Sequence, residues 1–600
     1  MTSESYWKVA SKGRGLDRRL LVGAFGALAL ALALALRPAS QWLSSFTPDG
    51  ALTPGTARFL DSGAWLWGLA GIVTLIAGLS AVVRQALAAG WREPAPFRPV
   101  SSAIIPRVGS SFPWLAPGFG LLAFGLRIAV AAFSDIGLGD DGARVAWLQQ
   151  WLEDPHWVWS GLWLPAHLYL HALFNAVIHD LVWSGVLLSA CAAGGTVWIL
   201  TCGVQAHWGS FAAVVAAALA TVLPVSLAYG ANPDVNPVFA FFVVSSTAAV
   251  LRARSEYEAQ RRTAFRWLFL SWFCLAAASW MRFDCIVLVP AIAVLLWPRR
   301  WTAIAFAVAA AVPLVLWNVA DSVITQQPGR VMNVVQQDPT LGGSIISQAF
   351  TFGGGIWQAV TLPVVFLGTM GVVRALRACR GRGWIVPALA HLAALAGTTL
   401  VFHAGTQPRY FLVVASIWAA YAGVGLAGIA ARSRRVAGAV GLLGLALLAS
   451  TPQLYPGESD LWMRRSPELR SLVDEVSRLA DGGHVVWVSE ESGYFYSCRV
   501  QPPRRFYHAL PRPDSDPRTV IEGLREADSA IACVQQLPLP RQRWESLSTL
   551  LAGDWIVEPL ATRGNYQLLA LRRTGLAQYS AVPTLGASAN VPEACSRSFP

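Results

Sequence analysis

The sequence contains little charge and almost no lysine. Only 13% of its 600 residues are Asp, Glu, Lys or Arg, whereas soluble domains carry roughly 25%. Lys8 and Lys12 are its only lysines. Because 54% of the residues are hydrophobic, this composition excludes an ordinary soluble domain and predicts a membrane protein with many spans.

Several common functional signatures are also missing. The chain shows no internal repeat of 20–50 residues. Its last 150 residues or so contain no metal-ligand spacing, no phosphate-binding glycine loop and no nucleophile elbow. The net charge of +12 would suit a nucleic acid or an anionic lipid. The arginines that carry it follow the loops of a membrane protein, so we expect membrane lipid and no nucleic acid as a partner.

Long apolar runs predict the transmembrane helices. A span needs roughly 20 residues to cross about 30 Å of hydrocarbon, and this length predicts about 13 transmembrane helices. They lie at residues 20–38, 63–84, 113–133, 181–203, 210–229, 235–251, 266–281, 283–298, 301–319, 355–373, 384–403, 409–431 and 436–452. The first run also resembles a secretory signal, but Arg37 and Pro38 make a poor cleavage site, so we expect an uncleaved anchor.

Arginines cluster in alternate loops and predict the orientation. The basic segments lie before the first span, at 92–107, 252–262, 299–300, 374–382 and 432–435, whereas the loops 39–62, 134–180, 230–234, 320–354 and 404–408 carry only isolated cations. Basic loops stay on the cytoplasmic side. We therefore expect a multi-pass protein of the cell (inner or plasma) membrane with a cytoplasmic N-terminus, a first outward loop at 134–180, and an extracytoplasmic region after residue 453.

This orientation divides the chain into three parts. Residues 1–112 hold the cytoplasmic N-terminal segment and two spans, and residues 113–452 hold the main transmembrane region. In residues 453–600, "SPELRSLVDEVSRLADGG" has helical spacing, "HVVWVSE" reads as a buried strand, and "WIVEPLATRGNYQLLALRR" reads as two strands. The sequence thus predicts an α-helical polytopic membrane protein with a small C-terminal extracytoplasmic α/β domain, in which Cys498 and Cys533 either form a disulfide or stay free.

Polar residues next to the apolar runs are the candidate functional residues, because such groups are costly at membrane depth. Nearly all fall at the predicted outer ends of spans, which indicates a shared pocket at the outer membrane boundary. They are Asp140, Asp141, Arg144, His167, His171, Asp234, Arg282, Asp284, His403 and Arg409.

The order of these motifs resembles a known superfamily. A span is followed by "GDDGARVAWLQQWLEDPHW", then "WLPAHLYLHALF", then an apolar pair ending at "GANPDVNPVFAFFVV", and later by "WMRFDCIVLVPAIAVLL" and "TQPRYFLVVASIWAAYAGVGLA". This arrangement resembles the GT-C glycosyltransferases, in particular the protein O-mannosyltransferase and aminoarabinose transferase branch (glycosyltransferase family 39-like). The resemblance implies transfer of a sugar from a polyprenyl-phosphate donor to an extracytoplasmic protein, lipid or polysaccharide acceptor.

The resemblance also assigns roles to residues. Asp140 matches the first acid of the family motif and would act as the general base for the acceptor hydroxyl. Asp141 stands where many relatives have Glu and would position the acceptor or its neighbouring acid. The departing lipid phosphate needs cations or hydrogen-bond donors. The candidates for this binding are Arg282, Arg409, the adjacent Tyr410, Arg330 and Arg144, with His167 and His171 as substitutes for a lysine of the aminoarabinose branch.

The chain departs from the family in two ways. It has two additional spans before the acid motif, and its first outward loop has no DxD triplet, so we expect no obligatory metal or other cofactor. Neither the sugar nor the acceptor can be read from the sequence. A transporter or flippase of lipid-linked glycans and a non-catalytic assembly or sensor protein remain as alternatives.

Structural roles compete with each functional one. Asp140 and Asp141 suit the first turn of a helix, where carboxylates meet its dipole. Arg282 would pair with Asp284 as an interfacial anchor, and Arg409 would extend to the outer surface. The two histidines would pack as ordinary polar groups or hold a metal, and Asp234 would serve as a turn residue.

Overall fold

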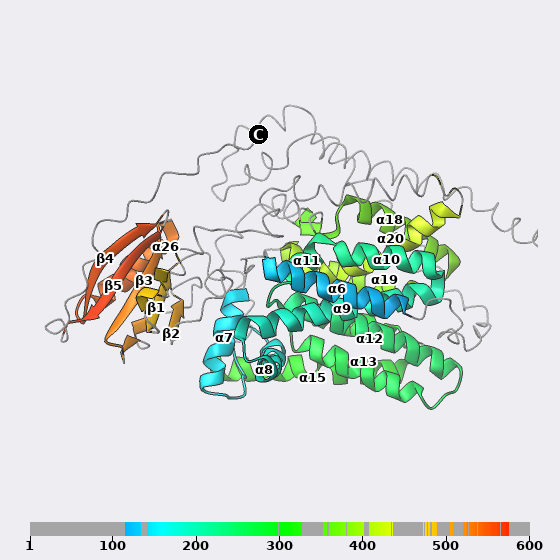
Figure 1. The fold of residues 1–600 in the computed structure, drawn as a ribbon. Coiled ribbons are helices and arrows are strands. Elements are labelled where there is room, and N and C mark those ends of the chain that lie inside the picture. Colours follow the sequence, from blue (N-terminus) through cyan, green and yellow to red (C-terminus); the bar gives the residue numbers. More distant parts are fainter. Residues whose placement is uncertain are drawn as a thin grey trace, which may run out of the picture. The chain divides into compact units, whose positions relative to one another are not determined.

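The computed structural model contains two compact units, residues 1–466 with 493–499 and residues 467–492 with 500–600 (Figure 1). The described residues are mainly 114–133, 141–326 without 162 and 298, 359–431 without 380 and 401–406, and much of 472–574. The predicted spans 20–38, 63–84 and 436–452 lie outside them.

The first unit is entirely helical in its described residues. Its elements are α6 (Leu115–Phe133), α7 (Asp141–Glu153), α8 (Ala166–Ile178), α9 (Leu181–Trp208), α10 (Ser210–Val222), α11 (Pro224–Gly230), α12 (Val235–Glu258), α13 (Ala264–Ser279), α14 (Cys285–Val294), α15 (Arg300–Thr325), α18 (Leu362–Ala378), η2 (Arg382–Trp384), α19 (Ile385–Leu400), η3 (Pro408–Phe411) and α20 (Leu412–Ala430). Figure 1 shows α6, α9, α12 and α13 running alongside one another.

Four helices in the described part of the chain are long and apolar enough to cross a membrane. They are α9, α12, α15 and the continuous segment η3–α20. The chain is therefore a multi-pass membrane protein, while the count of about 13 spans stays a prediction. The predicted span 283–298 is longer than the helix found there, because α14 has only 10 residues and ends before a turn at Leu295–Trp297.

The predicted span 210–229 is two helices rather than one. The axes of α10 and α11 differ by 55°. The break falls at Pro224, which has no N–H to continue the helical hydrogen bonds. Arg127 of α6 is fully buried beside it and donates to the main-chain oxygen of Ser226 at 3.0 Å and to the Ser226 hydroxyl. These bonds satisfy an arginine that would otherwise be costly in an apolar interior.

Close contacts between small residues hold the helices together. In a membrane, association depends on packing and on hydrogen bonds between helices. Gly371 of α18 lies against the carbonyl of Tyr421 in α20, and Gly425 of α20 lies against the carbonyl of Leu367. Two hydrogen bonds join α12 and α13. The Ser246 hydroxyl donates to the main-chain oxygen of Ser271 at 2.9 Å, and the Ser271 hydroxyl donates to the main-chain oxygen of Ser246 at 2.8 Å.

Substituting Gly371 with alanine is expected to lower the stability of the helical unit. A Cβ at this position would fall on the Tyr421 carbonyl, and neither backbone can move aside without separating α18 from α20. Overpacking of this kind costs about 1–3 kcal/mol. Thermal unfolding in detergent measures it. Gly397→Ala on α19 is the control, since no atom lies within 4 Å of a Cβ there. Equal melting temperatures for the two variants would contradict the prediction.

Basic loops from distant parts of the chain meet at one end of the helices. Arg254, in the last turns of α12, donates to the main-chain oxygen of Leu295 at 3.3 Å. Arg299 lies 4.4 Å from the ring centroid of Tyr257. Arg374 of α18 lies 5.3 Å from the ring centroid of Trp208 at the end of α9. The loops around 252–262, 295–300 and 374–384 therefore form one basic end.

The second unit contains a mixed five-stranded sheet. Its strands are β1 (His484–Val488), β2 (Arg505–His508), β3 (Ser529–Gln535), β4 (Trp555–Arg563) and β5 (Tyr566–Arg573), in the order β2-β1-β3-β5-β4. The first three pair in parallel, and β5 and β4 are antiparallel to their neighbours. Helix α26 (Pro538–Leu551) packs on it through Leu547 and Leu551.

The strands expected in this unit are present. "HVVWVSE" contains β1, and the predicted strand pair is β4–β5. Strand β2 was not expected. Cys533 is a free, buried cysteine of β3, and burial raises the pKa of its thiol. Cys498 lies outside the described residues.

Candidate functional site

Helix α7 carries the start of the acid motif. It begins at Asp141 and runs across the direction of the long helices (Figure 1). Asp140 and the side chain of Asp141 lie outside the described residues. Arg144, one turn into the helix, is buried with its guanidinium carbon 4.8 Å from the ring centroid of Trp163. The acid motif therefore leads directly into a helix whose first turn points an arginine inward.

The two histidines of α8 are buried and close together. Their ring centroids are 5.8 Å apart. Nε2 of His171 lies 2.8 Å from the main-chain oxygen of Leu181, and this ring also packs against Gly185 of α9. Helix α8 is thus fixed against the start of α9, where Gly185 also lies against Pro233 of the turn before α12. Among the described residues, no three His, Cys, Asp or Glu side chains gather as a metal-ligand set.

The turn before α12 contains the first charged pair. Asp234 is the N-cap of α12, and its Oδ1 accepts from the main-chain N–H of Asn236 at 2.6 Å and from the Asn236 amide at 2.7 Å. Its Oδ2 lies 3.5 Å from Nη1 of Arg409 in η3, with both side chains almost fully buried. Asp234 is therefore both a capping residue and the partner of a buried arginine.

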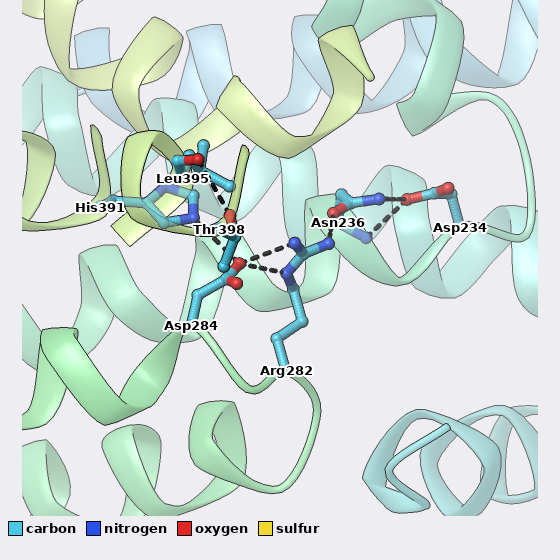
Figure 2. A network of polar contacts seen from close by, with 7 residues as sticks. All are labelled: Asp234, Asn236, Arg282, Asp284, His391, Leu395 and Thr398. Atoms are coloured by element: carbon cyan, nitrogen blue, oxygen red, sulfur yellow. Dashed lines mark hydrogen bonds and ion pairs between the residues drawn. The ribbon is translucent and has the colours of Figure 1, made fainter. Parts of the chain in front are cut away.

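Arg282 and Asp284 form the second charged pair, in the turn between α13 and α14. Oδ2 of Asp284 accepts from Nε of Arg282 at 2.8 Å and lies 2.6 Å from its Nη2. Nη1 of Arg282 donates to Asn236, and Nε2 of His391 on α19 lies 3.3 Å from Asp284 Oδ2. Figure 2 shows the resulting chain of contacts from His391 through Asp284, Arg282 and Asn236 to Asp234.

Tyr410 joins the two arginines. The guanidinium carbon of Arg282 lies 4.5 Å from its ring centroid, and that of Arg409 lies 5.4 Å from it. An aromatic face attracts a cation and keeps its donors free to point elsewhere. We call the set Asp234, Asn236, Arg282, Asp284, His391, Arg409 and Tyr410 the arginine network.

The structure therefore brings together candidates that are far apart in the sequence. Asp234, Arg282, Asp284, Arg409 and Tyr410 meet in one network, and the predicted pairing of Arg282 with Asp284 is confirmed. His171 lies near the edge of the network, because Gly185 packs against both its ring and Pro233, the neighbour of Asp234. Arg330 and His403, like Asp140, lie outside the described residues.

Sequence reasoning missed two members of the arginine network. Asn236 stands in "NPDVNP", where turn chemistry seemed a sufficient explanation. His391 lies inside the apolar run 384–403, whose other histidine, His403, stands at its end. A polar residue at membrane depth is itself a signal of function, and this signal would have pointed to His391.

Comparison with known proteins supports the family resemblance. Residues 164–321 match the family model of dolichyl-phosphate-mannose-protein mannosyltransferases. This range runs from just before α8 into α15 and contains four of the seven residues of the arginine network, namely Asp234, Asn236, Arg282 and Asp284. None of the curated proteins matches the sequence.

Solved structures with a similar fold include ArnT from Cupriavidus metallidurans. In the apo state it is 14% identical, with a TM-score of 0.50, over 76% of this chain and 97% of that one. Bound to undecaprenyl phosphate it is 12% identical, with a TM-score of 0.49, over 77% and 98%. The Archaeoglobus fulgidus oligosaccharyltransferase complex with Zn and sulfate is 11% identical, with a TM-score of 0.44, over 76% and 72%. The predicted resemblance is confirmed: residues 164–321 match the family model and the fold is similar to that of ArnT, which supports a membrane glycosyltransferase of the GT-C, family 39-like kind.

Proposed function

We propose that this protein transfers a sugar from a polyprenyl-phosphate donor to an acceptor on the outer side of the cell membrane. The observation that carries the proposal is the arginine network. Two arginines from distant segments, Arg409 buried and Arg282 with 13% of its side chain exposed, flank one tyrosine ring at a single place in the helical unit. A departing lipid phosphate gains negative charge, and fixed guanidinium groups stabilise that charge.

The ion pairs of the network fit a site that is empty between turnovers. Arg282 is paired with Asp284 and Arg409 with Asp234, so the buried cations are compensated while no phosphate is present. Both arginines also face Tyr410, so one aromatic ring lies between the two cations that would bind the phosphate. A phosphate that binds there exchanges water for charge-assisted hydrogen bonds with two preorganised groups.

The proposed orientation in the membrane rests on a difference between the basic loops and the loops at the opposite ends of the helices. Arg254, Arg299 and Arg374 mark the basic end, which by the rule for basic loops faces the cytoplasm. The arginine network comes from the other set of connections, before α12, between α13 and α14, and before α20. Its location supports an outward site that a membrane-embedded lipid and an external acceptor can both reach.

The catalytic base belongs to the segment that leads into α7. Asp140 precedes that helix directly, and Arg144 and the α8 histidines are buried beyond it. The acceptor hydroxyl gives its proton to the Asp140 carboxylate as its oxygen attacks the anomeric carbon, and the bond to the lipid phosphate breaks. The related ArnT has been solved with undecaprenyl phosphate bound, which agrees with a lipid phosphate as the leaving group.

Membranes containing the protein test the function directly. Radiolabelled polyprenyl-monophosphate sugars are supplied, and both labelled acceptor and released polyprenyl phosphate are measured. We expect sugar transfer with equimolar release of polyprenyl phosphate. Movement of intact donor across the vesicle membrane without cleavage would instead identify a flippase. No consumption of any donor, combined with a phenotype that depends only on residues 453–600, would identify an assembly protein.

Cysteine labelling tests the sidedness. In a variant without its native cysteines, His156→Cys places a thiol in the exposed segment after α7, and Ala259→Cys places one at the exposed end of α12. A membrane-impermeant maleimide added to intact cells or spheroplasts is expected to label position 156 and to label position 259 only after lysis. Labelling of position 259 before lysis, with position 156 protected, would reverse the topology.

A further inference from the structure

We propose that His391 is a positioning residue of the glycosyltransferase reaction, which holds Arg282 through Asp284 in the orientation that binds the donor phosphate. The inference rests on the proposed function and extends it to α19. His391 has no measurable exposure, and its Nε2 lies 3.3 Å from Oδ2 of Asp284. The same carboxylate oxygen receives two nitrogens of Arg282 (Figure 2).

The geometry fixes which nitrogen of His391 carries the proton. The carboxylate of Asp284 can only accept, so Nε2 of His391 donates to it. Nδ1 is buried and has no hydrogen-bond partner in the part of the chain that the structure describes, and the ring of Phe239 lies 5.7 Å away, centroid to centroid. A second proton on Nδ1 would be a buried donor without an acceptor. His391 therefore serves as a neutral donor.

A neutral donor suits this place better than a charged one. A lysine or arginine at 391 would compete with Arg282 for Asp284 and would add a second buried charge. A neutral imidazole orients the Asp284 carboxylate but does not neutralise it, so this carboxylate remains the counterion of Arg282. Asp284 can then hold two nitrogens of Arg282 while Nη1 of Arg282 is held by Asn236. Arg282 is thus held from α12, α14 and α19 together.

Loss of this hydrogen bond should affect the donor more than the acceptor. Without His391, Asp284 is held only by Arg282 and gains freedom to rotate, and Arg282 loses its fixed orientation. A guanidinium out of place binds phosphate less well. The acceptor hydroxyl is assigned to Asp140, in the separate segment that precedes α7.

The test compares two substitutions in detergent-purified full-length protein. His391→Leu removes the donor and keeps a similar volume, whereas His391→Gln keeps an N–H in reach of Asp284. We expect a donor KM about tenfold higher for His391→Leu, with the acceptor KM unchanged, and a donor KM within about twofold of wild type for His391→Gln. Thr398→Val on the same helix is the control, because the Thr398 hydroxyl donates to the main-chain oxygen of Leu395 within α19.

The background variant Asp284→Asn separates positioning from packing. In that background His391→Leu is expected to have no further effect on the donor KM, because the carboxylate it acts on is gone. An unchanged donor KM for His391→Leu, or equal changes in the donor and acceptor KM values together with a lowered melting temperature, would overturn the inference while leaving the proposed function intact. Failure of the wild-type protein to use any polyprenyl-phosphate sugar would overturn the proposed function itself.

Discussion

Replacing Asp140 with asparagine is expected to reduce sugar transfer by roughly 10²–10⁴-fold, the range that general-base catalysis contributes. The amide has nearly the same size as the carboxylate but cannot take the proton of the acceptor hydroxyl. The loss should appear in kcat, because the donor still binds through the arginine network. Initial rates of transfer to the acceptor measure it, and donor-dependent protection against thermal unfolding measures binding in the same samples.

Asp154 provides the matched control for this prediction. It follows α7, its side chain is 93% exposed, and its nearest ion-pair contact is His156 at 4.0 Å. Asp154→Asn changes the net charge of the same loop by the same amount and should leave transfer within about twofold of wild type, since surface charges contribute little. Transfer by Asp140→Asn at the rate of Asp154→Asn would remove Asp140 from the role of base. If Asp141 only positions its neighbour, the rate of sugar transfer by Asp141→Asn should lie between the rates of Asp140→Asn and Asp154→Asn.

The parts of the fold that could be predicted follow from local pattern. Apolar runs located α9, α12, α15 and α20, with starts within three residues and ends within seven, because span length is set by the thickness of the bilayer. The bend between α10 and α11 was missed although Pro224 is visible in the sequence. A proline inside an apolar run either kinks the helix or is tolerated because neighbouring groups satisfy the freed backbone carbonyl, so the residue alone does not predict a bend. Arg127 of another helix lies against the segment after this break.

The charged members of the arginine network and Tyr410 were predicted, whereas Asn236 and His391 were missed. Arg282, Asp234 and Arg409 stand out because charges at span ends are rare. His391 is 107 residues from Asp284, and Asn236 is 46 residues from Arg282. Contacts over such separations depend on how helices pack, which periodicity along one helix does not encode. A neutral polar side chain therefore has no visible partner until the fold is known.

Replacing Arg409 with glutamine is expected to raise the donor KM by about 30-fold. Hydrogen bonds to charged groups contribute about 1.5–3 kcal/mol, and about 2 kcal/mol corresponds to a factor of roughly 30 in affinity. The acceptor KM should stay unchanged. Arg374→Gln, at the basic end against Trp208, is the control, because it removes the same charge from a helix end far from the network and should not alter donor use.

Asp234 allows the ligand role of Arg409 to be separated from its pairing role. Arg409→Gln leaves the Asp234 carboxylate almost fully buried without its cation, which by itself would disturb the turn before α12. Asp234→Asn removes that charge and keeps a good N-cap residue, so the double variant carries no unpaired buried acid. If Arg409 binds the phosphate, the double variant keeps the high donor KM while its melting temperature recovers. If Arg409 only neutralises Asp234, the double variant regains the wild-type donor KM, and the phosphate must be bound by other residues.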